Sequence, residues 1–209
     1  RDTSEMAATT HGRQSANRVG VEGFDFTWHM RLVCEDMVRR LPELQHIDLS
    51  RVAIGWCRTR KRVSHGLYAS LTPMRFKGGA VTEQRGDQRY GVQRLVGEEG
   101  QEMLYILSFY LPRFMDTTMS EKLITIIHEL WHISPNFDGD LRRFPGRCYA
   151  HTTSEQEYDR QMAELAAKWL VLNPPRSLYD FLGLSLEQLK ERYGRIYGTR
   201  IPQPKLIPM

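Results

Sequence analysis

The feature that most constrains this chain is the pentapeptide His128-Glu129-Leu130-Trp131-His132. On a helix, residues four apart lie on one face, so the two imidazoles of an H-E-x-x-H pattern can bind one metal ion. Glu129 sits one position further round, where its carboxylate can reach a water in the open coordination position. The pattern therefore predicts a zinc site on a helix, with His128 and His132 as ligands and Glu129 as general base.

The sequence before the pentapeptide is typical of a buried helix. Thr118 and Glu121 have the spacing of a capping box, which predicts a helix running to about His132. Burying a polar side chain without a partner is costly, so two histidines at the end of such a helix indicate a function. The apolar positions that would be buried are Leu123, Ile124, Ile126, Ile127 and Leu130.

A catalytic zinc usually takes three protein ligands and one water, so a third ligand is expected downstream. We favour His151, which follows His132 by 19 positions and lies in a loop from which it can swing to the metal. Asp138 is an alternative because it has the spacing of the third ligand in metzincins. The Asp138-Gly139 pair is also typical of an ordinary turn, which is the competing interpretation of this residue.

Two further alternatives stay open. Glu164 lies on the next predicted helix, but on its polar stripe, where we expect it to pair with Lys168. Cys148 could bind zinc, although a lone cysteine is more often a small hydrophobic residue of the core.

Length and composition predict one domain with tails. The chain has 209 residues, of which 41% are hydrophobic, enough for a single substantial core. We expect a flexible N-terminal tail over 1–23, one domain over 24–198 and a C-terminal tail over 199–209. No stretch approaches the roughly 20 apolar residues that span a bilayer, so no membrane partner is expected.

Strands followed by helices predict an α+β fold. The expected strands lie within Arg51–Arg58, Leu67–Leu71, Tyr90–Val96 and Met103–Tyr110, the last two flanking a hairpin turn over Gly97–Gly100. Polar connections are expected over Thr59–Arg62 and Lys77–Asp87. A helix is expected from Phe26 to about Leu41, and further helices begin at capping boxes that start with Thr118, Ser154 and Ser185.

Charge and cysteine content add weak indications. The net charge of +4 and a pI near 9.0 mildly favour acidic or nucleic-acid partners. Cys34, Cys57 and Cys148 are few and lack a C-x-x-C pair, which argues against a disulfide framework and fits a reducing cytoplasm.

Residues from about 50 to 170 resemble a metallopeptidase domain family of phages and bacterial genomes. The matching positions are Gly66–Ala69, Met74–Phe76, Pro112–Phe114, Glu121–Leu123, His128–Ile133, Phe137–Phe144, Gly146, Arg147, Tyr149, His151, Tyr158 and Asp159. The resemblance implies a zincin-like fold, with an N-terminal helix, a small mixed or antiparallel sheet, a metal-binding helix and C-terminal helices.

A more distant resemblance is to SprT-like proteases, which follow the H-E-x-x-H helix with a downstream histidine motif. His151 sits where that histidine would fall. SprT-like proteins act on DNA-bound proteins, which implies a protein or peptide substrate and makes nucleic acid a possible partner.

The reaction we expect is peptide hydrolysis with zinc as cofactor. Developing oxyanion charge needs a donor, which Arg147, Tyr149 or Tyr158 could supply. The strand Met103–Tyr110 precedes the metal helix, and in zincins an edge strand often lines the cleft and pairs with an extended substrate. The rival is a nucleic-acid- or protein-binding regulatory module of phage or defence origin, in which zinc is structural and no hydrolysis occurs.

Overall fold

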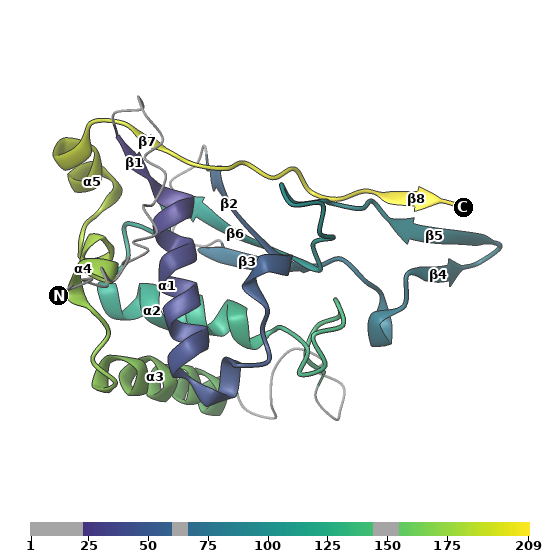
Figure 1. Cartoon of the computed structure of the whole chain (residues 1–209), viewed down its shortest axis with the longest axis horizontal. Coiled ribbons are helices and arrows are strands. Elements are labelled where there is room, and N and C mark those ends of the chain that lie inside the picture. The colour runs from purple at the N-terminus through teal and green to yellow at the C-terminus, as the bar shows by residue number, and fades with distance from the viewer. Residues whose placement is uncertain (1–22, 60–66, 144–154) are drawn as a thin grey trace, which may run out of the picture.

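The computed structural model describes residues 23–59, 67–143 and 155–209, and in them helices and strands combine in an α+β arrangement (Figure 1). The predicted N-terminal tail falls almost wholly outside these ranges. The helices are α1 (Phe26–Arg40), α2 (Met119–Trp131), α3 (Glu155–Val171), α4 (Arg176–Tyr179) and α5 (Leu186–Tyr193). The strands are β1 (Phe24–Asp25), β2 (Val52–Arg58), β3 (Ala69–Pro73), β4 (Thr82–Arg85), β5 (Gln88–Val92), β6 (Tyr105–Leu111), β7 (Ile196–Tyr197) and β8 (Leu206–Pro208).

Helix α1 lies where the apolar stripe predicted it. The Asp25 carboxylate accepts a hydrogen bond from the Trp28 amide at 3.0 Å and so caps the first turn. The helix ends before Pro42, which cannot continue it and instead begins a short 3-10 turn. Asp36 is buried on this helix, where it accepts hydrogen bonds from Arg40 and from the Trp169 indole of α3.

The central sheet has three strands in the order β2-β6-β3. Strand β2 runs parallel to β6 and β3 runs antiparallel to it. Because side chains alternate across a strand, β6 contributes side chains to two hydrophobic clusters, one on each face of the sheet. Leu107 and Phe109 face the main core formed with the helices, and Ile106 faces a second cluster with Ala53 and Met74. Strand β6 is therefore buried on both faces and paired on both edges.

The expected hairpin between Tyr90–Val96 and Met103–Tyr110 is wrong. The chain does turn there, since Val96 and Glu102 form a β-bridge and the Gly97 amide donates to the Gln101 carbonyl at 2.8 Å. The two strands then separate, and β6 pairs with β2 and β3 while β5 pairs with β4 and β8. The physical reason is burial: every residue of β6 except Tyr110 is buried, so this strand lies inside the main sheet.

Residues 82–92 form a hairpin that was expected in part to be a polar connection. Arg85 pairs with Gln88, which leaves Gly86-Asp87 as a two-residue turn, and Gly86 has a φ of +58°. With β8 this hairpin makes an arm that projects from the main sheet in Figure 1.

Residues 199–209, expected as a tail, lie against the sheets. The Trp56 amide donates to the Thr199 carbonyl at 3.0 Å, and Ile201 packs beside Gly55. Further along, β8 pairs with β5. The segment thereby occupies the outer edge of β2 with hydrogen bonds that a solvated tail would lack.

The helices of the last third agree with their sequence signals. Thr118 and Glu121 form the predicted capping box of α2, and Ser185 and Gln188 form that of α5. Helix α3 is also present, although its predicted cap, Ser154, lies outside the described residues. In the described part of the chain, no helix is long and apolar enough to cross a membrane. Cys34 and Cys57 are unpaired thiols there, and Cys148 falls outside it.

A buried lysine joins α2 to the C-terminal elements. The Lys122 side chain is 1% exposed, and its ammonium donates to the carbonyls of Leu182 at 2.8 Å and Leu184 at 2.9 Å. Burial lowers the pKa of Lys122 to about 8, against the opposing influence of Asp116 and Glu121. Folding therefore disfavours the charged form of this side chain.

We expect alkaline pH to stabilise the protein through Lys122. Between pH 8 and 10.5 the unfolded chain keeps a proton on Lys122 that the folded chain has lost, so the contribution of Lys122 to the free energy of unfolding rises with pH in that window. The gain over the whole window is about 2–3 kcal/mol. Urea unfolding at several pH values should show the free energy of unfolding of wild type rising relative to that of Lys122→Met, since the buried Cys34 thiol, whose raised pKa acts in the opposite sense, is common to both proteins. Parallel pH curves for the two proteins would contradict it.

Candidate functional site

The two histidines of the pentapeptide lie together at the C-terminal end of α2. His128 is in the last turn and His132 is the C-cap residue, and their ring centroids are 4.7 Å apart. Both side chains are partly exposed, whereas the adjoining Ile127 and Leu130 are fully buried. The helix thus presents two imidazoles from one face to a partly open space, as the four-residue spacing predicts.

Glu129 lies between them in sequence but is directed to the sheet. It is only 9% exposed, and its carboxylate accepts a hydrogen bond from the backbone amide of Leu71 in β3. Burial raises the pKa of Glu129 to about 7, although the Leu71 hydrogen bond opposes the rise. Within the described residues Glu129 makes no ion pair with a lysine or arginine. Its proton-accepting capacity is therefore not neutralised by a fixed cation there.

The strand beside this carboxylate has an outer edge with no strand partner among the described residues. Tyr68 and Met74, at the two ends of β3, bond to Tyr110 and Leu104. In an antiparallel pair alternate residues bond to the neighbouring strand, so Leu71 directs its amide and carbonyl away from β6 and toward α2. The expected edge strand, Met103–Tyr110, instead became the central strand, and β3 is the strand that borders the site.

Tyr158, from α3, forms an apolar wall behind the histidines. Its ring stacks with His132 at a centroid distance of 6.2 Å and meets His128 edge-on at 5.0 Å. The side chain is fully buried, which raises the pKa of Tyr158 well above its usual value, and the nearby Glu129 raises it further. Tyr158 is therefore a neutral phenol at physiological pH, and α3 fixes the orientation of both imidazoles.

Asp138 is used in a turn. Its carboxylate accepts a hydrogen bond from the Asp140 amide at 3.1 Å, and its side chain lies against Gly79. The neighbouring Asp140 is buried and accepts bonds from Gly78 and Arg143. The structure does not bring Asp138 together with the histidine pair into a metal-binding group.

Glu164 is also away from the pair. It is exposed on α3 and lies 3.6 Å from the Arg160 guanidinium. The expected pairing with Lys168 is wrong, because Lys168 reaches Glu43 at 2.6 Å instead. The Glu43 carboxylate comes from a segment far away in the sequence, so the spacing of residues along α3 could not reveal this ion pair.

The remaining candidates fall outside the described residues: His151, Cys148, Arg147 and Tyr149. Within the described part of the chain, no group of three histidine, cysteine, aspartate or glutamate side chains could hold a metal ion. The prediction that His151 is the third ligand therefore remains a prediction.

Substitutions can distinguish His151 from Asp138. We expect His151→Ala to weaken zinc binding by more than about 100-fold, since losing even an outer-shell partner costs about 10–100-fold. Asp138→Ala should leave zinc affinity unchanged and lower only the melting temperature, because it removes a turn hydrogen bond. Competition titration with a zinc-binding dye measures both. Loss of zinc from Asp138→Ala with His151→Ala unaffected would instead indicate a metzincin-like ligand set.

Arg142 has a role that the sequence did not suggest. The neighbouring Arg143 makes an ion pair with Asp140. The Arg142 side chain instead donates to the Trp131 carbonyl at 2.7 Å and stacks on the Trp131 ring at 4.2 Å, while its amide donates to the His132 carbonyl. A cation at a helix C-terminus is favourable, so Arg142 caps α2 directly beside the histidines.

Comparison of the chain with known protein families, with curated proteins and with solved structures found no match. The inference of function therefore rests on the chemistry of the residues at the end of α2.

Proposed function

We propose that this chain is a zinc-dependent metallopeptidase of the zincin type. The observation that carries the proposal is the position of Glu129: a buried carboxylate held by the backbone of an edge strand, next to two imidazoles on one helix face. Among the described residues this carboxylate serves neither as an ion-pair partner nor as a cap, and a buried carboxylate of that kind has little structural purpose.

The donor set fits zinc. Imidazole nitrogens are preferred zinc ligands, and His128 and His132 supply two of them from one face of α2. The third protein ligand would come from outside the described residues, and His151 is our candidate. A bound zinc ion would supply a Lewis acid that lowers the pKa of water and polarises a carbonyl.

The residues of the chain would then perform the proton transfers. Glu129 would accept a proton from the attacking water and pass it to the leaving amine. In the metal-free chain burial raises the pKa of Glu129, and a bound zinc ion would lower it again and so favour the carboxylate form that accepts the proton. The Tyr158 ring would hold the imidazoles in place, and its neutral hydroxyl is the described candidate for a donor to the developing oxyanion.

An extended peptide is the substrate class that the adjoining strand favours. The outward carbonyl of Leu71 could accept a hydrogen bond from a substrate backbone in the β-augmentation mode. The Leu71 amide already binds the Glu129 carboxylate, so substrate and general base would lie side by side at this edge.

Zinc removal and restoration tests the proposal. Protein stripped with a chelator and then given one equivalent of zinc should regain cleavage of labelled, unfolded casein or of its own chain. Zinc-loaded protein that cleaves neither, yet unfolds on chelation, would favour the alternative of a regulatory binding module with structural zinc.

A further inference from the structure

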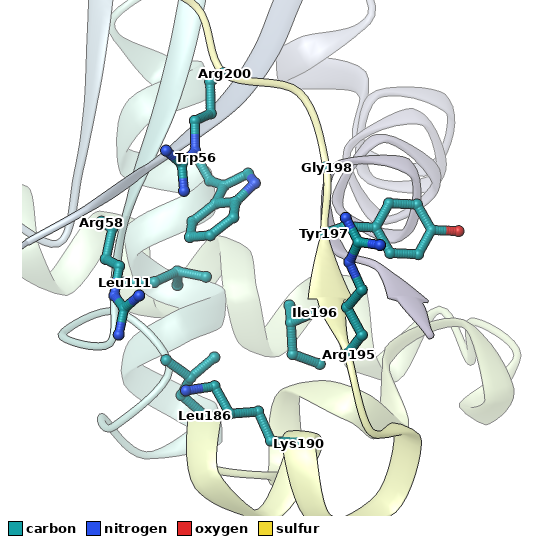
Figure 2. Close-up of a pocket in the computed structure, with 10 residues that line it drawn as sticks. All are labelled: Trp56, Arg58, Leu111, Leu186, Lys190, Arg195, Ile196, Tyr197, Gly198 and Arg200. Carbon is teal, nitrogen blue, oxygen red and sulfur yellow. The ribbon is translucent and has the colours of Figure 1, made fainter. Parts of the chain in front are cut away.

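A pocket separate from the histidines lies between the main sheet and the C-terminal elements (Figure 2). Its volume is about 360 Å³, at the lower end of the range of about 300–1,000 Å³ that is common for small-ligand sites. Trp56 of β2 and Leu111 of β6 form one wall, and Leu186 of α5 and Ile196 of β7 face them. None of these residues belongs to the histidine site, so the pocket can be tested independently of the proposed hydrolysis.

Four cationic side chains line this pocket: Arg58, Lys190, Arg195 and Arg200. Among the described residues no aspartate or glutamate lines the pocket, and none of the four cations makes an ion pair with a carboxylate there. Arg200 lies over the Trp56 ring at 4.9 Å, and Arg195 over Tyr197 at 5.9 Å. In Figure 2 Arg58 and Lys190 lie on the Leu111 side of the opening and Arg195 on the opposite side.

This charge distribution favours a multiply charged anion. Four cations around one concave, partly apolar space focus a positive potential that the protein does not neutralise locally. A carboxylate brings one negative charge, whereas a phosphate or diphosphate brings about two or three and presents several acceptor oxygens to guanidinium donors. The Trp56 indole nitrogen is a further donor at the pocket wall, buried and without a partner among the described residues.

The apolar wall indicates that the ligand carries more than a phosphate. Trp56 is 9% exposed and Leu111 is fully buried, so the base of the pocket is closed by hydrophobic groups while the cations stand at its mouth. A flat or compact organic group could occupy the base with its phosphates directed to the mouth. We propose that the pocket binds a nucleoside phosphate, either a free nucleotide or the phosphorylated end of a nucleic-acid strand.

Isothermal titration calorimetry on the full chain tests the proposal with ADP, pyrophosphate, adenosine and a short single-stranded oligonucleotide with or without a 5′-phosphate. We expect ADP or the 5′-phosphorylated strand to bind more tightly than pyrophosphate, and adenosine to bind much more weakly. Comparison of the affinity for ADP with that for the 5′-phosphorylated strand shows whether the ligand is a free nucleotide or the end of a nucleic-acid strand. Affinity should fall with added salt, because the contacts are charged and partly exposed.

The double variant Arg58→Gln, Lys190→Gln should weaken the binding of ADP or of the phosphorylated strand by about tenfold or more. Both residues are exposed, so circular dichroism should show an unchanged fold. Arg192→Gln is the matched control, since Arg192 lies on α5 outside the pocket lining and should leave affinity unchanged. Absence of binding would overturn the proposal. Strand binding that ignores both the 5′-phosphate and the double variant would also overturn it.

Discussion

Replacing Glu129 by Gln is expected to slow peptide hydrolysis by about 10²–10⁴-fold, the contribution typical of general acid–base catalysis. The amide has the shape of the carboxylate, and its oxygen can still accept the hydrogen bond from the Leu71 amide. It cannot take a proton from water at neutral pH. The variant should therefore keep its zinc and its fold while losing the proton transfer, and rate assays on zinc-replete protein measure the difference.

Stability gives a second measurement on the same variant. The Glu129 carboxylate is buried without an ion-pair partner among the described residues, so the neutral amide should be at least as easy to bury. The melting temperature of Glu129→Gln is therefore expected to equal or exceed that of wild type. Glu164→Gln is the control, because Glu164 is exposed on α3 and should affect neither rate nor zinc. A zinc-replete Glu129→Gln protein that cleaves as fast as wild type would eliminate the proposed mechanism.

The helices could be predicted because their signals are local. Thr118 with Glu121, and Ser185 with Gln188, satisfy backbone groups within one turn, and the structure contains both boxes as expected. The same holds for the histidine pair, whose proximity follows from helical geometry alone.

Strand pairing could not be predicted because it depends on distant segments. The turn at Gly97–Gly100 is present, yet β6 pairs with β2, some fifty residues earlier, since the alternating residues of β6 fill two cores. Residues 199–209 were expected to form a tail, but β8 gains hydrogen bonds from the edge of β5.

The contacts around the candidate site could not be predicted from the sequence either. Nothing in the sequence near Leu71 indicates that its amide meets Glu129, because the strand register that turns it outward is fixed by β6. The position of Arg142 over Trp131 depends on the return of the loop onto α2, through the pairing of Ile133 with Leu141. The four cationic side chains that line the pocket beside Trp56 come from segments more than 130 residues apart. The positive net charge of the chain was the one sequence feature that indicated them.

Replacing His128 or His132 by Ala is expected to abolish tight zinc binding. Wild-type protein should hold about one zinc per chain if, as we propose, the two imidazoles belong to its ligand set. Loss of an outer-shell partner lowers metal affinity by about 10–100-fold, so loss of a ligand should cost more than that range. Metal analysis after dialysis should find wild type loaded and both variants essentially empty.

The control for this experiment is His29→Ala. His29 lies on α1, where it stacks on Phe24 and its ring bonds to the Asp25 carbonyl at 2.7 Å. Its removal should lower the melting temperature and leave zinc content at about one per chain. The contacts of His128 and His132 with the buried Tyr158 ring mean that their variants will also lose some packing. Circular dichroism of the metal-free proteins separates the two effects, since wild type and variants should then have nearly the same helix content. Full zinc content in either His128→Ala or His132→Ala would show that the metal, if bound, is held elsewhere in the chain.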